Sequence, residues 1–372
     1  MTASIFSLYL DEKGASSFEL GLIISLMSYT TLITQIPLGL ISKRVGVWWI
    51  IPLALVGQST SYFLYSLAPL PYFYPIRIFH AVVSASLQPT LLSYASAIVP
   101  ENNRGEAIGV YLTSVGLAMM SGPLINSVLL MFVGYQTILI IATAIPLIAL
   151  VLYVYLLRVD VFHRHFTRTS NNEPSRVDSW NSLKTIFMLR PVQALTVIRF
   201  TFAFTMSILT TLYAIYAVNI LGISPSIYAF YITLKGMANT IARFPTGRIT
   251  DVIGRKKPLL FSFILLSIVF FFLAELKHPI QVGLLIFFHG ISHGTRAVSE
   301  WSMLSDAVRN EDRELAHFYF STVFSLGSAL GATFAGSAAM VISTPTILQI
   351  AAVLTSSSIF IVAITKFPRK RN

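Results

Sequence analysis

The sequence predicts an all-α protein, a polytopic bundle of transmembrane helices built from two similar halves. Hydrophobic residues make up 55% of the 372 positions and charged residues only 11%, and the mean hydropathy is +0.73. A soluble chain carries roughly a quarter charged residues. The apolar residues fall into runs of about twenty, the length that crosses a hydrocarbon core of ~30 Å. The third observation is a repeat of loop chemistry about half the chain apart.

That repeat is visible in two pairs of segments. Gly39-Leu-Ile-Ser-Lys-Arg-Val-Gly46 is echoed 208 residues later by Gly247-Arg-Ile-Thr-Asp-Val-Ile-Gly254. Ile78-Phe79-His80, followed by Arg104, is echoed at nearly the same offset by Phe287-Phe288-His289, followed by Arg313. Internal duplication in a hydrophobic chain is typical of transporters built from structural repeats.

We expect eleven full spans in order. They are Phe18–Ile41, Val47–Ala68, Tyr72–Ile98, Ala107–Phe132, Thr137–Leu157, Val192–Leu221, Ile227–Thr246, Leu259–Leu276, Ile280–Asp306, Leu315–Ile342 and Thr346–Thr365. The polar, proline-containing segment between the fifth and sixth divides the chain. The predicted units are an N-terminal helical half (1–157), a central loop (158–191) and a C-terminal helical half (192–372).

The N-terminus departs from the repeat. Before the acidic turn that starts at Asp11 stand only Met1–Leu10, and ten residues reach ~15 Å as a helix, half a bilayer. The duplication requires a first helix here, matching Arg199–Ile220. We therefore expect a stub of the first span, with most of it missing through a misplaced start codon or a true truncation.

The formal charge of +11 does not indicate a nucleic-acid partner. Most Lys and Arg residues lie in short alternate connections between apolar runs, with no soluble basic domain. An excess of Lys and Arg marks the cytoplasmic side. We therefore expect a multi-pass protein of the cell membrane with the central loop and the C-terminus in the cytoplasm. The chain has no cysteine, so its redox compartment cannot be inferred.

The second glycine-framed turn resembles the signature loop of the major facilitator superfamily. Gly247, Asp251, Gly254, Arg255 and Lys256 match the family pattern Gly-x-x-x-Asp-x-x-Gly-Arg-Lys.

The first half matches less fully. Gly39 and Gly46 match, but Lys43 stands where the family has aspartate. The segment from Arg77 to Ala81 resembles the fourth-helix motif Arg-x-x-Gln-Gly, with His80 in place of glutamine. Gly116 and Gly122-Pro123 resemble, incompletely, the fifth-helix motif associated with antiporters.

The resemblance spans the chain from Ser7 to Lys366. It implies two six-helix halves that rock about a midplane site, driven by an ion gradient. It also implies a conformational latch at the cytoplasmic surface, where Asp251 pairs with Arg313 or Arg248. The alternative is that these charges only anchor a solvated loop. The expected latch residues are Gly39, Gly46, Gly247, Asp251, Gly254, Arg255 and Arg313.

Charges inside the predicted spans indicate where a solute binds, because each costs several kcal/mol unless paired or hydrated. Arg77, Arg199, Lys235 and Arg296 are basic, and Glu300 is the one well-embedded acid. An alternative for Arg199 is snorkelling towards the cytoplasmic surface. Arg296 and Glu300, spaced i,i+4, can also neutralise each other.

Three polar stripes at helical spacing predict a water-accessible cavity. They comprise His289, His293, Arg296 and Glu300; Tyr228, Tyr231, Lys235 and Asn239; and Arg77, His80, Ser84 and Gln88. Interhelical hydrogen bonding is the alternative for any single His or Gln. The candidate cavity residues are Arg77, His80, Gln88, Arg199, Tyr231, Lys235, Asn239, His293 and Arg296.

The sequence therefore predicts a secondary active transporter that moves a small solute by alternating access. Because Lys235 and Arg77 leave the predicted cavity net positive, we expect an anionic substrate. Glu300, with His293, is the candidate for proton coupling. Gly122-Pro123 favours efflux of a drug or metabolite, whereas the positive cavity fits uptake of an organic anion equally well.

Rival functional classes remain open. No phosphate loop, metalloprotease helix or nucleophile elbow is present, so we expect no enzyme and no cofactor. His289 and His293 are spaced as metal ligands are, but a third ligand is not evident. A receptor or scaffold that kept the fold without transporting is the alternative function. We expect a monomer in the lipid bilayer, with the solute and protons as its partners.

Overall fold

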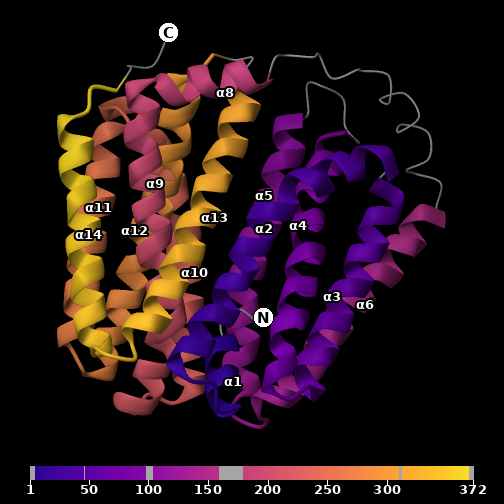
Figure 1. Ribbon diagram of the computed structural model, residues 1–372. Coiled ribbons are helices and arrows are strands. Elements are labelled where there is room, and N and C mark those ends of the chain that lie inside the picture. Colours follow the sequence, from indigo (N-terminus) through magenta and orange to yellow (C-terminus); the bar gives the residue numbers. More distant parts are fainter. Residues whose placement is uncertain (1–4, 46, 98–103, 159–178, 310–311, 368–372) are drawn as a thin grey trace.

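The protein is a bundle of long helices that run roughly side by side (Figure 1). The computed structural model describes residues 5–45, 47–97, 104–158, 179–309 and 312–367, and these contain helices and no strands. In Figure 1 the helices of the first half lie on one side and those of the second half on the other.

The helices of the first half follow the chain in order. They are α1 (Phe6–Glu12), α2 (Ser17–Val45), α3 (Val47–Leu67), α4 (Phe73–Ala97), α5 (Arg104–Leu129) and α6 (Tyr135–Arg158). A short 3₁₀ turn at Leu70–Tyr72 precedes α4. The predicted stub is α1, a seven-residue helix whose side chains from Phe6 to Leu10 are buried.

The second half begins with a helix that the sequence did not single out. The bounds are α8 (Ser179–Met188), α9 (Arg190–Ile208), α10 (Pro225–Ile253), α11 (Lys256–Glu275), α12 (Pro279–Ala307), α13 (Arg313–Ala338) and α14 (Thr344–Ile364). Two π-helical turns, Leu209–Tyr213 and Tyr216–Ile220, prolong α9. Helix α8 falls within the segment predicted as the central loop, whose residues 159–178 lie outside the described part.

The predicted helical membrane bundle is confirmed. Each expected span coincides with a helix of 19 to 29 residues. One predicted boundary is wrong. The span expected to end at Thr246 is helix α10, which continues to Ile253 because nothing before Gly254 interrupts it. Gly247 and Asp251 are therefore helical residues.

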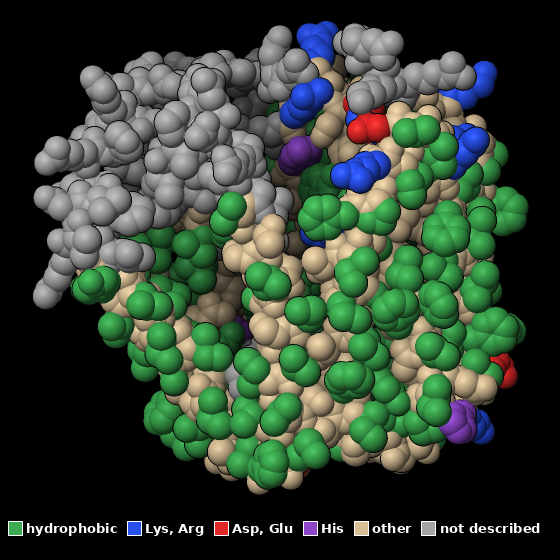
Figure 2. All heavy atoms as spheres, turned by 180° about the vertical axis from the view of Figure 1, so that it is seen from behind, with side chains coloured by type: hydrophobic (Ala, Val, Ile, Leu, Met, Phe, Trp, Pro, Cys, Tyr) green, Lys and Arg blue, Asp and Glu red, His purple; other side chains and the backbone are tan. Residues whose placement is uncertain are grey.

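Seven of the described helices are apolar and long enough to cross a membrane by length and composition. These segments are Ser17–Gln35, Trp49–Leu67, Tyr135–Tyr155, Arg190–Tyr213, Lys256–Glu275, Leu315–Ala338 and Thr344–Ile364. Helices α4, α5, α10 and α12 fall outside this set; α4, α10 and α12 carry the polar stripes, and α5 contributes only the shorter apolar segment Thr113–Leu129. Figure 2 shows hydrophobic side chains over the middle of one face and charged ones gathered mainly at one edge. That distribution fits a surface in contact with lipid.

The duplication is visible in the backbone. Gly14 and Gly222, 208 residues apart in the sequence, both have positive φ, at +81° and +67°. Each follows the first helical segment of its half, where a left-handed residue ends the helix and glycine bears no Cβ penalty. Gly254, with φ of +83° and ψ of 159°, ends α10 in another conformation that glycine adopts most readily. Its first-half counterpart, Gly46, lies outside the described residues.

The two ends of the bundle differ in their connections. One end, which we call the short-loop end, holds the turns at Gly14 and Gly222 and lies near α1 in Figure 1. The opposite end, which we call the basic end, holds the turn at Gly254 and the approach to the C-terminus.

Candidate functional site

The two halves meet closely at the short-loop end, where α2 crosses α13. A Cβ built on Gly21 would lie 2.6 Å from Gly336 Cα, and one built on Gly336 would lie 2.6 Å from the Ser17 carbonyl oxygen. Real Cβ atoms do not approach so closely. Glycine at both positions therefore lets the backbones of the two halves touch.

Hydrogen bonds between the halves reinforce this end. Asn219 Nδ2 donates to Asp11 Oδ2 at 2.8 Å, which joins the two repeat-related first helices. Between α5 and α10, Ser127 Oγ donates to the Ser226 carbonyl at 2.8 Å, and Ser226 Oγ donates to the Ser127 carbonyl at 2.5 Å. The described contacts thus hold the short-loop end closed.

Between the halves lies a cavity of about 480 Å³. Its walls come from α1, α5, the α9 region, α10 and α12. The lining residues are Ser7, Val115, Ala118, Met119, Pro123, Met206, Thr210, Ala214, Tyr228, Ile232, Lys235, Gly236, Asn239 and His293. Three of the predicted cavity residues, Lys235, Asn239 and His293, are therefore brought together on one wall. Tyr228, which the sequence placed in the same stripe, joins them.

Lys235 supplies a basic group to this cavity. It is partly buried, and its Nζ has one described hydrogen-bond partner, Met206 Sδ at 3.9 Å. A thioether is a weak acceptor, so the ammonium retains capacity to bind a stronger one. One turn along α10, Asn239 Oδ1 accepts a hydrogen bond from Arg243 Nε at 3.0 Å. Arg243 was missed by the sequence reasoning, although it continues the Lys235–Asn239 spacing by another four residues.

Next to the cavity, α9 and α12 share a buried group of charges. Glu300 Oε2 is 3.3 Å from Arg199 Nη1 and also pairs with Arg296, one turn earlier on α12. Glu300 is fully buried, and the exposed fractions of Arg296 and Arg199 are 2% and 7%. The snorkelling alternative for Arg199 is therefore wrong. Arg296 and Glu300 do pair, but a second guanidinium shares the carboxylate and leaves the group with a net positive charge.

Aromatic rings surround the excess positive charge. The Arg199 guanidinium lies 4.7 Å from the Phe324 ring centre and 5.0 Å from the centres of both Trp301 and Phe320. The Arg296 guanidinium lies 3.5 Å from the ring centre of Phe202. Such contacts stabilise a cation by roughly 0.5–2 kcal/mol each. These contacts therefore offset part of the free-energy cost of burying two arginines beside a single carboxylate.

The two histidines of α12 differ in their environments. His289 is fully buried, with its ring against Phe270, and neither of its nitrogens has a hydrogen-bond partner among the described residues. His293 reaches the cavity, with its ring centre 5.1 Å from that of Phe202. The rings of the two histidines are 6.4 Å apart. No group of three or more metal-binding side chains occurs in the described residues.

Glycines on α12 explain why the Lys235 stripe lies beside the charged group. A Cβ on Gly290 would overlap the carbonyl oxygen of Lys235, and one on Gly294 would overlap that of Asn239. Without these side chains α10 and α12 approach closely. The basic wall of the cavity and the buried arginines are thereby placed in adjacent layers.

The remaining predicted cavity residues lie elsewhere. Arg77 faces α1, with its guanidinium 4.4 Å from the Phe6 ring centre, and His80 packs edge-on against Tyr62 at 5.3 Å. Tyr231 donates from its hydroxyl to the Pro279 carbonyl at 2.9 Å. None of these three predicted residues lines the cavity between the halves. The Gln88 side chain lies outside the described residues.

At the basic end, a charge pair connects the signature turn to α12. Arg255 pairs with Asp306 and also donates to the Ser302 carbonyl. Arg313 Nε donates to the Ser305 carbonyl at 3.1 Å. Asp306 is the partner that the sequence reasoning passed over, because it considered only Asp251. A latch made by Asp251 stays a prediction. Two of the expected latch residues, Gly39 and Gly46, lie outside the part of the chain for which side-chain surroundings are described.

Comparison with known proteins agrees with this architecture. The profile described as Major Facilitator Superfamily matches residues 1–195 and again 195–372. A transporter of Methanocaldococcus jannaschii described as MFS-type is 24% identical over 264 residues, which cover 71% of this chain and 67% of the relative. Multidrug resistance protein 2 of Bacillus subtilis is 23% identical over 326 residues, 86% of this chain and 80% of the relative.

A solved structure shares the fold. The crystal structure of the nucleoside transporter NupG superposes with a TM-score of 0.80 at 12% identity, and the match covers 97% of this chain and 93% of that one. Because the family profile matches both halves, this membrane-embedded, multi-pass chain belongs to the Major Facilitator Superfamily, whose members are transporters of small molecules and not enzymes.

Proposed function

We propose that the protein transports a small organic anion with an apolar body across the cell membrane by alternating access, coupled to protons. The observation that carries this proposal is the Lys235 ammonium in the cavity between the halves, beside an arginine-rich buried group. We also propose that the C-terminus lies in the cytoplasm, which the basic connections at its end of the bundle favour.

The charge of the solute follows from the charges that face it. Lys235 is in the cavity wall, and Arg199 and Arg296 share one carboxylate behind it. A cation brought into this region meets repulsion, whereas a carboxylate or similar anion supplies the missing counter-charge. Charge-assisted hydrogen bonds of this kind contribute about 1.5–3 kcal/mol each.

The apolar body follows from the opposite wall. Helix α5 contributes Val115, Ala118, Met119 and Pro123, which offer apolar surface and no charge. A volume near 480 Å³ lies in the range of drug-sized ligand sites. The similarity to a multidrug resistance protein supports a solute of mixed polarity.

Proton coupling is proposed for Glu300, assisted by His293. Protonation of Glu300 removes the counter-charge of two buried arginines and so favours entry of a second anion, the solute. Proton and anion binding then assist each other, and both cross in the same direction. If the Glu300→Gln variant carries pH-driven flux at the wild-type rate, this role is excluded.

Flux in proteoliposomes tests the function itself. Purified protein is screened by thermal shift against aromatic and aliphatic carboxylates, their amides and a set of antimicrobial drugs, and each stabilising compound is then tested for counterflow. We expect carboxylates to exchange and their uncharged amides not to. Counterflow by cationic drugs alone would overturn the anionic assignment, and binding without flux of any compound would favour a receptor or scaffold.

Replacing Lys235 with methionine is expected to weaken the affinity for the anionic solute by about ten- to a hundredfold. Methionine keeps the unbranched apolar stem and removes only the charge, and loss of a charge-assisted hydrogen bond costs about 1.5–3 kcal/mol. The measurement is the KM for counterflow. Lys366→Gln, an exposed lysine at the basic end, serves as the control. An unchanged KM in Lys235→Met would remove Lys235 from the binding site.

A further inference from the structure

A second and larger hollow lies outside the interface between the halves. It has a volume of about 600 Å³ and runs between α10 and α11, with α12 behind it. Its rim is made of apolar side chains exposed to the surroundings, among them Ile249 at 44%, Ile253 at 48% and Phe261 at 53%. On a membrane-embedded protein, exposed apolar side chains of this kind fit contact with the hydrocarbon of the bilayer. We call this hollow the α10–α11 groove.

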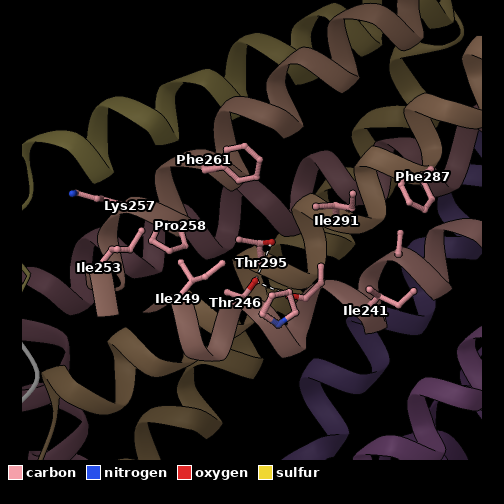
Figure 3. A pocket seen from close by; sticks show the side chains of 13 residues that line it. Ile241, Thr246, Ile249, Ile253, Lys257, Pro258, Phe261, Phe287, Ile291 and Thr295 are labelled. Carbon is pink, nitrogen blue, oxygen red and sulfur yellow. Dashed lines mark hydrogen bonds between the residues drawn. The ribbon is translucent and has the colours of Figure 1, made fainter. Parts of the chain in front are cut away.

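The groove exists because α10 is drawn away from α11 towards α12. Gly290 and Gly294 let α12 contact the α10 backbone directly. Pro245 on α10 and Pro258 at the start of α11 line the space that remains between these two helices. Figure 3 shows Lys257, Ile253 and Pro258 at one end of the groove and Phe287 and Ile241 at the other.

The groove is long enough to span the hydrocarbon depth of one leaflet of a membrane. Its α10 wall extends from Ala238 to Ile253, which at 1.5 Å per residue is about 22 Å. One leaflet contributes half of a hydrocarbon core of ~30 Å. An acyl chain that enters at the basic end therefore has apolar wall along the full depth of its leaflet.

The floor of the groove is closed to polar ligands. Its two hydroxyl groups contact each other: Thr246 Oγ1 lies 3.3 Å from Thr295 Oγ1, and 2.6 Å from the Ala242 carbonyl to which it donates. Figure 3 shows this pair in the middle of the floor. An occupant with hydrogen-bonding groups would find few partners, whereas a hydrocarbon chain needs none.

Among the described residues that line the groove, one carries a charge, and it lies at the basic end. Lys257 is exposed on the first turn of α11 and takes part in no salt bridge with the described residues. Its neighbour Lys256 is already committed, since its Nζ donates to the carbonyls of Ala363 and Thr365 at 2.7 and 3.1 Å. Lys257 therefore remains available for an anion that sits above an apolar chain.

We propose that the α10–α11 groove binds an anionic phospholipid, with one acyl chain between α10 and α11 and the headgroup phosphate on Lys257. The apolar walls, a length that exceeds the hydrocarbon depth of one leaflet and the single lysine at the basic end fit that molecule. The site is separate from the solute cavity between the halves, so it stands or falls independently of the transported substrate.

Native mass spectrometry of the full-length protein tests the site. Delipidated protein is titrated with dioleoylphosphatidylglycerol and with dioleoylphosphatidylcholine, which have the same acyl chains and differ in net charge. We expect the anionic lipid to bind about fivefold more tightly, because a single basic residue near the membrane surface contributes about that much to the affinity for an anionic headgroup. Lys257→Gln is expected to abolish that preference, and Ile249→Trp, which fills the groove, to weaken both lipids.

Matched controls separate the groove from the rest of the surface. Lys366→Gln removes an exposed lysine at the same end, and Phe244→Trp enlarges an α10 side chain, 81% exposed, that does not line the groove. Both should bind lipid as the wild type does. Ile253→Trp is the second groove-filling variant if Ile249→Trp unfolds at a lower temperature. Retained anionic preference in Lys257→Gln, or wild-type binding in a folded groove-filling variant, overturns the proposal.

Discussion

Replacing Glu300 with glutamine is expected to lower the stability of the folded protein by several kcal/mol. The change leaves Arg199 and Arg296 buried at 7% and 2% exposure with no carboxylate between them. Removing one partner of a buried ion pair costs about 3–5 kcal/mol because the other charge stays buried and uncompensated. The measurement is thermal unfolding of the purified protein in detergent. Glu275→Gln, an exposed carboxylate that accepts from Gln349 at 2.6 Å, should change little.

A double-mutant cycle distinguishes the ion group from a general packing effect. If the arginines are destabilising once Glu300 is gone, the double variant Arg199→Gln/Glu300→Gln should lower the free energy of unfolding by less than the sum of the two single changes. Coupling energies between contacting residues run to about 3 kcal/mol. Simple additivity would mean that the cost of Glu300→Gln arises elsewhere in the structure.

Replacing Gly336 with leucine is expected to prevent the halves from closing at the short-loop end and to reduce flux by about tenfold or more. A Cβ at this position lies 2.7 Å from Gly21 Cα and 2.6 Å from the Ser17 carbonyl oxygen. Both are backbone atoms of the opposite half and cannot move aside cheaply. Overpacking of about 1–3 kcal/mol shifts the balance between two conformations by about five- to 150-fold.

Site-directed labelling measures this shift directly because the chain has no cysteine of its own. Thr210→Cys places one thiol in the wall of the cavity between the halves. In Gly336→Leu, a membrane-impermeant maleimide should label this thiol more from the side of the short loops than it does without the leucine. The comparison uses intact cells and inverted vesicles, which expose opposite sides of the membrane. Gly134→Leu is the control, since no atom lies within 4 Å of a Cβ there. Unchanged labelling would show that the Gly21–Gly336 contact does not control access.

Much of the candidate site was accessible to sequence reasoning because the helical period is local. The i,i+4 spacing of Lys235 and Asn239 put them on one face of α10, and both do line the cavity. The same period applied to Arg77 and His80 also gave a single face, yet that face packs on Phe6 and Tyr62. Spacing along one helix identifies which residues share a face. It does not say which neighbour the face meets.

The order of residues along the chain was enough to infer three properties: the membrane character, the places of the long helices and the relation between the two halves. Run length, hydropathy and the repeated glycine turns are local properties that any packing must respect. Helix packing, in contrast, brings Glu300 to Arg199, a residue 101 positions away, as well as to its own helical neighbour Arg296. Packing also sets α10 against α12 and apart from α11, which opens the α10–α11 groove. These contacts depend on how helices rotate and approach one another, and side-chain size at glycines such as Gly290 and Gly294 sets that distance.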